Sequence, residues 1–186
     1  MARGRQSSTV KVITGRDRDL LKQLSKTGVC TGGQAKEHAG VSHERLQKLE
    51  KSGYVKTSNH TVRGENNKII QIDKAGAEYA RQEFGTERLC PSQTNHLEHD
   101  IKLTEFYYNL EPEIQDTWRH EGDLIKDYYE KFPDAEGKLQ TCIDATIEVG
   151  GETIAVESVG DSYSGSTMEL KEQIAESLGC SRMESF

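Results

Sequence analysis

The charged residues of this chain are divided unevenly along its length. Residues 1–90 contain 17 Lys and Arg against 10 Asp and Glu, a net charge of +7, whereas residues 91–186 contain 7 against 21, a net charge of −14. A chain of 186 residues is long enough for two small domains, and the charge break favours two. We therefore expect a basic arm over residues 1–12, a basic domain over 13–90 and an acidic domain over 91–186.

The basic front half indicates an anionic polymer as its partner. The whole chain has a pI of about 5.4, so the average conceals this local excess of positive charge. Clustered Lys and Arg bind polyphosphate by releasing its counterions, whatever the mean charge of the protein. The charge pattern thus predicts a nucleic-acid-binding domain followed by a domain with another role.

Three predicted helices in the basic half share one pattern, a Thr or Ser cap at the start and a Gly at the end. They run from Thr14 to Gly28, from Thr31 to Gly40 and from Ser42 to Gly53. The first has Leu20, Leu21 and Leu24 on one face. The turn of about three residues before the third helix is the spacing of a helix-turn-helix.

A β-hairpin and a further helix are expected after the third helix. Strand-forming residues begin at Tyr54, turn formers occupy residues 63–68, and the run KIIQID over residues 68–73 alternates as a strand does. A helix is expected over residues 74–84. The fold class predicted for the whole chain is α+β.

These elements resemble the winged-helix DNA-binding domains of bacterial regulators. The resemblance covers residues 10–85 and rests on VSHERLQKLEKSGYV, the hairpin and KAGAEYA. It implies that the third helix enters the major groove of double-stranded DNA while the hairpin, or wing, touches the backbone or minor groove. The alternatives are a solvated basic helix face and a protein-docking module, whose contact face would be apolar or acidic.

The resemblance implies candidate DNA-binding residues on the arm, the second and third helices and the wing. Arg45 and Gln47 suit base edges, because Arg pairs with guanine and Gln with adenine. The other candidates suit phosphates or positioning. They are Arg3, Arg5, Thr31, Gln34, His43, Lys48, Lys51, Arg63 and Lys68.

The acidic half is predicted to be an α/β module with a β-hairpin and flanking helices. Residues 140–149 and 152–159 flank Gly150-Gly151 as two strands around a turn, and a helix is expected over 167–178. An earlier helix over 94–110 carries an apolar stripe, which suits either the domain core or a dimer contact. Residues 118–132 suit a strand followed by a helix or loop.

The predicted hairpin can be compared with PD-(D/E)xK nucleases, in which strand carboxylates hold Mg²⁺ and a Lys orients water. Asp144 and Glu157 match the two carboxylates, but Val159 stands where the Lys is expected. Only a Lys from elsewhere, such as Lys171, could complete the set. The sequence therefore favours a degenerate nuclease-like module, or an unrelated α+β module, for oligomerisation or partner binding. No catalytic residue, metal or cofactor is expected.

The complete plan resembles the replication-relaxation family of plasmid and mobile-element proteins. The segments that carry this likeness are HLEHDIKL, IDA and AVES. The resemblance implies a sequence-specific DNA-binding protein, foremost a transcriptional regulator of a plasmid, phage or other mobile element. The alternatives are an accessory protein of plasmid replication or conjugative transfer and a Mg²⁺-dependent nuclease.

The remaining sequence features bear on location and partners. The four cysteines are far apart and form no CxxC pair, so neither a disulfide framework nor a zinc knuckle is expected. No signal peptide and no apolar run of membrane-spanning length is found in the sequence. We expect a cytoplasmic protein that forms a homodimer, binds no membrane and offers its acidic half to a protein partner.

Overall fold

The computed structural model describes residues 7–91, 93–160 and 163–186, which form a mixed α+β protein. It divides into two compact units, Met1–Ile101 and Lys102–Phe186. The boundary falls after Ile101, later in the chain than the charge break at residue 90. Helix α5 (Leu97–Tyr108) carries the chain from the first unit into the second.

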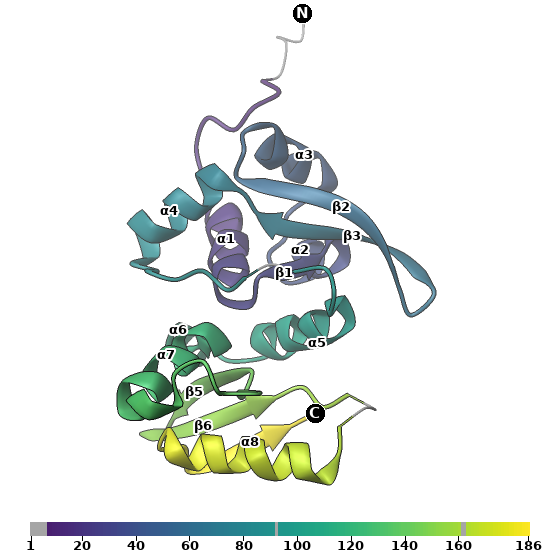
Figure 1. The fold of residues 1–186 in the computed structure, drawn as a ribbon. Helices are drawn as coiled ribbons and strands as arrows, with labels where there is room; N and C mark the ends of the chain where they lie inside the picture. Colours follow the sequence, from purple (N-terminus) through teal and green to yellow (C-terminus); the bar gives the residue numbers. More distant parts are fainter. Residues whose placement is uncertain (1–6, 92, 161–162) are drawn as a thin grey trace, which may run out of the picture. The chain divides into compact units, whose positions relative to one another are not determined.

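The first unit consists of helices and a three-stranded antiparallel sheet in the order β1-β3-β2 (Figure 1). Before α5, its elements in chain order are α1 (Gly15–Thr27), β1 (Val29–Thr31), α2 (Gly32–Glu37), α3 (His43–Lys51), β2 (Val55–Val62), β3 (Glu65–Ile72) and α4 (Lys74–Phe84).

The expected caps begin the first three helices. The side chains of Thr14, Thr31 and Ser42 each accept a hydrogen bond from the backbone of the third residue of the helix that follows. Such bonds satisfy amides that the helix itself leaves without partners. The second helix is shorter than expected, since α2 ends at Glu37.

The hairpin is longer and tighter than the sequence indicated. Strand β3 begins at Glu65, and Val62 pairs with Glu65 across a turn of only Arg63 and Gly64. Both turn residues have positive φ, 50° and 81°. A two-residue turn of this kind matches the natural twist of the strands, so residues 65–68 extend the ladder instead of forming a loop.

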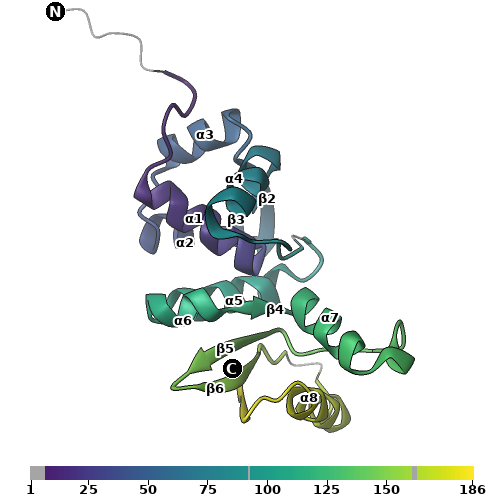
Figure 2. The same cartoon turned by 90° about the vertical axis from the view of Figure 1, so that its left-hand side faces the viewer.

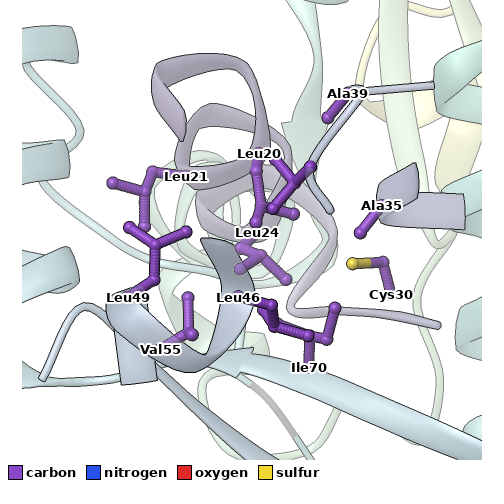
Figure 3. Close-up of a cluster of buried hydrophobic side chains, with 11 residues drawn as sticks. Leu20, Leu21, Leu24, Cys30, Ala35, Ala39, Leu46, Leu49, Val55 and Ile70 are labelled. Atoms are coloured by element: carbon purple, nitrogen blue, oxygen red, sulfur yellow. The ribbon is translucent and has the colours of Figure 1, made fainter. Parts of the chain in front are cut away.

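The core of the first unit joins α1 to α3 and to the sheet. Figure 3 shows Leu20, Leu21 and Leu24 facing the α3 leucines and the strand residues. All of these side chains are buried. Burial of a leucine of this kind contributes about 1.5–3 kcal/mol, so the apolar face of α1 fixes the position of α3.

Gly76 explains how α4 closes the first unit. A Cβ atom added at Gly76 would lie 2.1 Å from the carbonyl oxygen of Tyr54. The backbone of α4 therefore approaches the start of β2 more closely than any side chain permits. The Gly at the third position of this helix is therefore a packing requirement.

A buried ion pair connects the start of α1 to α3. Arg45 donates from Nε to Oδ1 of Asp17 at 2.9 Å and from Nη2 to Oδ2 at 2.5 Å. It also donates to the carbonyl oxygen of Val12 at 2.8 Å. The Asp17 side chain is fully buried and that of Arg45 is 26% exposed. Arg45 thus holds together the chain before α1, α1 itself and α3.

The second unit has a four-stranded mixed sheet in the order β4-β5-β6-β7. Strands β6 and β7 are parallel, and the other neighbours are antiparallel. Parallel neighbours require a crossover, which α8 provides. After α5, the elements in chain order are α6 (Pro112–Thr117), β4 (Arg119–His120), α7 (Glu121–Lys131), the 3₁₀ helix η1 (Pro133–Ala135), β5 (Ala145–Val149), β6 (Glu152–Glu157), α8 (Gly165–Ser177) and β7 (Arg182–Ser185).

Side chains on both faces of this sheet are buried. Ile154 and Val156 pack with Tyr107 and Trp118, whereas Ala155 packs on the opposite face with Ile174 of α8. Figure 2 shows α8 along this second face of the β5–β6 hairpin. The apolar stripe of the helix over 94–110 therefore contributes to the core, because its Tyr107 is only 1% exposed.

Among the described residues, no helix combines the length and the apolar character that crossing a membrane requires.

We predict that Asp17→Asn destabilises the first unit by about 2 kcal/mol, because Arg45 loses its charged partner. Native-state hydrogen exchange of the α1 amides measures this unfolding free energy. Burial raises the pKa of Asp17, but hydrogen bonds from Arg45 and Thr14 outweigh that effect and hold it below 3.8. The stabilisation is therefore present above pH 3.8, is lost as the pH falls through the lowered pKa, and is absent from the variant.

Glu83→Gln is the matched control, since Glu83 forms an exposed ion pair with Arg18. We expect this control to change the free energy of unfolding by less than about 0.5 kcal/mol. Equal effects of the two substitutions would contradict a structural role for Asp17.

Candidate functional site

Two carboxylates meet at the end of the β5–β6 hairpin. Asp144 directly precedes β5 and Glu157 ends β6, and the pairing of Ala145 with Val156 brings them opposite each other. The Asp144 amide donates to Oε2 of Glu157 at 3.3 Å, and the Ser158 amide donates to Oδ2 of Asp144 at 2.8 Å. Because strand residues alternate between faces, Glu157 shares the face of Ala155, which is covered by α8.

Lys171 of α8 completes the group. Its Nζ lies 2.5 Å from Oε1 of Glu157 and 3.9 Å from Oδ1 of Asp144. The side chains of Lys171, Asp144 and Glu157 are 4%, 9% and 0% exposed, respectively. The helix places Lys171 one turn before Ile174, on the face that packs against the sheet. The structure thus brings together the three residues that the sequence comparison named, with the Lys supplied from a helix.

Tyr163 is a fourth member that the sequence analysis did not identify. Its hydroxyl donates to Oε1 of Glu157 at 2.8 Å. The ammonium group of Lys171 lies 5.1 Å from the centre of its ring, a cation–π distance. Tyr163 lies in the loop before α8, where no spacing rule indicated a contact with the strand carboxylates.

Burial and close neighbours shift the pKa values of Glu157, Lys171 and Tyr163. Burial raises the pKa of Glu157 above its ordinary 4.5, and the Asp144 carboxylate adds to the rise, whereas Lys171 and Tyr163 oppose it. Burial lowers the pKa of Lys171, but the two carboxylates outweigh it and the pKa rises. Burial and the bond to Glu157 raise the pKa of Tyr163 to about 12. Lys171 therefore stays charged near neutral pH.

The donor set of this group fits a hard divalent cation. Carboxylate oxygens of Asp144 and Glu157 lie within 4.8 Å of each other. Mg²⁺ is typically bound by one or two carboxylates, with water and substrate phosphate as its other ligands. Asp144 and Glu157 are the residues that would hold such an ion.

A second candidate surface lies on the first unit. His43, Gln47 and Lys51 are exposed on α3 and Lys48 is half-buried. A groove of about 310 Å³ lies between α2, the start of α3 and the hairpin, and we call it the α2–α3 groove. His43 and Lys68, which the sequence analysis named, line it together with Lys36, Asn66 and Asn67. The sequence analysis named Thr31 and Gln34 of this second helix but not Lys36.

The lysines of this surface carry uncompensated charge. None of Lys36, Lys48, Lys51 and Lys68 forms an ion pair with the part of the chain that the structure describes. By contrast, Arg63 at the hairpin turn contacts Glu98 at 2.6 Å, with both side chains more than half exposed. Exposed pairs of this kind are weak and exchange readily with other partners.

Three other residues that were expected to contact DNA are engaged within the protein. Arg45 is engaged by Asp17 and Val12, so reading a base would require this ion pair to break. Thr31 and Gln34 are buried and cap each other's backbone amides, which occupies the groups that were expected to meet phosphate. We therefore assign these residues to the stability of the unit. Arg3 and Arg5 lie outside the described residues.

Comparison with known proteins yields no match: neither a family model, nor a curated protein, nor a solved structure is significantly similar to this chain.

We predict that Lys171→Met destabilises the second unit by about 3 kcal/mol near neutral pH, because two buried carboxylates lose their counterion. Without Lys171, burial and Asp144 raise the folded-state pKa of Glu157 further above 4.5. Stability is then retained below pH 4.5 and lost as the pH rises through the folded-state pKa. Urea unfolding followed by fluorescence of Trp118, the only Trp of the chain, measures the loss at about pH 5 and about pH 8.

Lys126→Met is the control, because Lys126 pairs with Glu130 on the exposed side of α7. An equal loss of stability at both pH values would show that Lys171 does not compensate a buried carboxylate.

Proposed function

We propose that the first unit is a winged-helix module that binds double-stranded DNA through α3 and the β2–β3 hairpin. The order of its elements supports this: a helix, a short strand, two helices joined by a brief turn, a hairpin and a closing helix. In this arrangement the helix after the turn is the one that enters the major groove. The observation that carries the proposal is that the lysines on the exposed side of α3 and in the adjoining groove form no ion pair with any carboxylate that the structure describes.

The residues of this surface divide by their chemistry. Gln47 is exposed near the middle of α3, and its side-chain amide suits the edge of an adenine. Lys48, Lys51 and Lys68 suit phosphates, which position a protein without reading sequence. Arg45 acts indirectly, since it holds α3 in place through Asp17.

We predict that replacing Lys48, Lys51 and Lys68 together by Ala weakens binding to duplex DNA. Each lysine that meets a phosphate releases about 0.9 counterion, so the salt dependence of log K should fall by about 2.7. Fluorescence anisotropy with a labelled duplex over a series of salt concentrations measures both affinity and slope.

Arg81→Ala on α4 is the control, because Arg81 is exposed but lies on the closing helix. An unchanged slope in the triple variant would overturn the assignment of this surface to DNA.

We infer a second candidate function for the other unit, a Mg²⁺-dependent phosphodiesterase of the PD-(D/E)xK type. The approach of Lys171 to both carboxylates favours it, because the sequence motif lacked a lysine only at position 159. A bound divalent cation supplies a Lewis acid and lowers the pKa of bound water. Asp144 and Glu157 would hold the ion, and Lys171 would orient water or stabilise negative charge on phosphate.

We predict that purified protein nicks supercoiled plasmid in the presence of Mg²⁺ or Mn²⁺ and not in EDTA. Asp144→Asn should lower the rate at least about a hundredfold, because the variant loses a charged metal ligand. Glu152→Gln, at the other end of β6, is the control that should retain the rate. Cleavage that survives in Asp144→Asn, or its absence from the wild-type protein, would contradict this second function.

The biological setting that we propose is regulation of a plasmid, phage or other mobile element, on the basis of the resemblance in sequence. An accessory role in plasmid replication or conjugative transfer uses the same DNA surface. Genomic footprinting separates them, since sites at promoters support regulation and sites at a replication or transfer origin support the accessory role.

A further inference from the structure

A hollow of about 810 Å³ lies in the second unit, and none of its lining residues belongs to the carboxylate group described above. The end of α7, η1, residues 138–140 and Leu170 of α8 line it, and we call it the α7–α8 hollow. Its volume falls within the range of small-molecule sites.

One wall of the hollow is aromatic. Tyr128 and Phe132 lie with ring centres 4.9 Å apart and planes inclined by 47°. Phe132 is 37% exposed, although a phenylalanine in a core would be covered. Leu139 and Leu170 add further apolar surface. A flat, largely apolar group can therefore stack against this wall.

Two lysines of this acidic unit line the hollow. The unit contains seven Lys and Arg, and four of them pair with carboxylates: Arg119, Lys126, Lys171 and Arg182. Of the other three, Lys131 and Lys138 line the hollow, whereas Lys102 does not. Neither Lys131 nor Lys138 forms an ion pair with a described residue. They donate to the carbonyl oxygens of Ser177 and Asp134, and the Lys131 ammonium lies 5.8 Å from the centre of the Phe132 ring. Asp134 contributes one carboxylate to the lining, so the hollow keeps a net charge of +1.

We propose that the α7–α8 hollow binds a nucleotide, with the base stacked on Phe132 and the phosphate between Lys131 and Lys138. Aromatic stacking combined with lysines that meet phosphate is the way in which proteins bind unpaired nucleotides. A base in an intact duplex is already stacked, so the ligand is either a free nucleotide or an unpaired nucleotide of a single strand.

The hollow is close to the carboxylate group along the chain. Gln140 lines the hollow and stands four residues before Asp144, a reach of at most about 14 Å. A strand held in the hollow could therefore extend toward Asp144. The nucleotide site itself does not depend on either proposed function.

The experiment measures binding to the full chain in EDTA, so that cleavage has no influence on it. Calorimetric titrations with dTMP, thymidine and inorganic phosphate test the two halves of the ligand. An oligothymidylate is titrated in the Lys48→Ala, Lys51→Ala, Lys68→Ala background, which removes the proposed DNA surface of the first unit. Binding of dTMP identifies a free nucleotide as sufficient, whereas binding of the oligothymidylate alone identifies a strand as the source.

We expect dTMP or the oligothymidylate to bind at least about tenfold more tightly than thymidine or phosphate, since stacking and charge both contribute. Phe132→Leu, which keeps apolar bulk in the wall but removes the ring, should weaken binding about tenfold. Lys131→Gln with Lys138→Gln should also weaken it and reduce its salt dependence. Lys126→Gln, on the same helix, is the control that should bind as the wild-type protein does.

Three outcomes would overturn the proposal. These are the absence of binding by both dTMP and the oligothymidylate, phosphate binding as tight as that of dTMP, and unchanged binding in both hollow variants. Failure of plasmid cleavage or of duplex binding leaves the result unaffected, because neither activity enters this measurement.

Discussion

The ion pair between the buried Asp17 carboxylate and Arg45 is the interaction on which the placement of α3 depends. This carboxylate caps α1 together with Thr14, and it receives the guanidinium group of Arg45 from α3. Asp17 is fully buried, and leaving a buried charge without its partner costs a protein several kcal/mol of stability. The ion pair therefore permits few alternative placements of α1 and α3. The leucines of α1 and α3 supply the attraction between these helices (Figure 3). The ion pair between Arg45 and Asp17 then restricts how the two helices are placed.

In the second unit, removing one buried charge destabilises the fold, but the set of charges as a whole is not needed to form the core. Apolar side chains already cover both faces of the sheet, and replacing a buried ion pair by apolar groups often stabilises a protein. Lys171, Asp144 and Glu157 therefore require an explanation beyond stability. Charges that converge from a hairpin and a helix, with the pKa values of Glu157 and Lys171 raised, are typical of functional sites.

Local signals in the sequence predicted much of the fold and less of the site. Helix caps at Thr14, Thr31 and Ser42 and the turn at Gly150-Gly151 depend on near neighbours, so the chain itself reveals them. Strand β7 was missed because it forms only by pairing in parallel with β6, far away in sequence. The sequence indicates a base edge for Arg45, and its contact with Asp17 could not be inferred because Asp17 lies 28 residues earlier.

The nuclease-like group of the second unit was also only partly predictable, because some of its members meet through tertiary contacts. Asp144 and Glu157 could be paired from the spacing of a hairpin, whereas Lys171 could only be named as a possibility on the next helix. The contact of Tyr163 with Glu157 depends on the path of the loop before α8, and that path cannot be predicted from the sequence pattern. Residues that act through tertiary contacts are thus harder to identify than those on one strand or helix.

The most direct test of the DNA-binding account is site-specific photo-crosslinking to a duplex in the full chain. A photoreactive amino acid in place of Gln47, exposed on α3, should crosslink to DNA, and the same residue in place of Glu78, exposed on α4, should not. Efficient crosslinking from position 78 with none from position 47 would contradict the account.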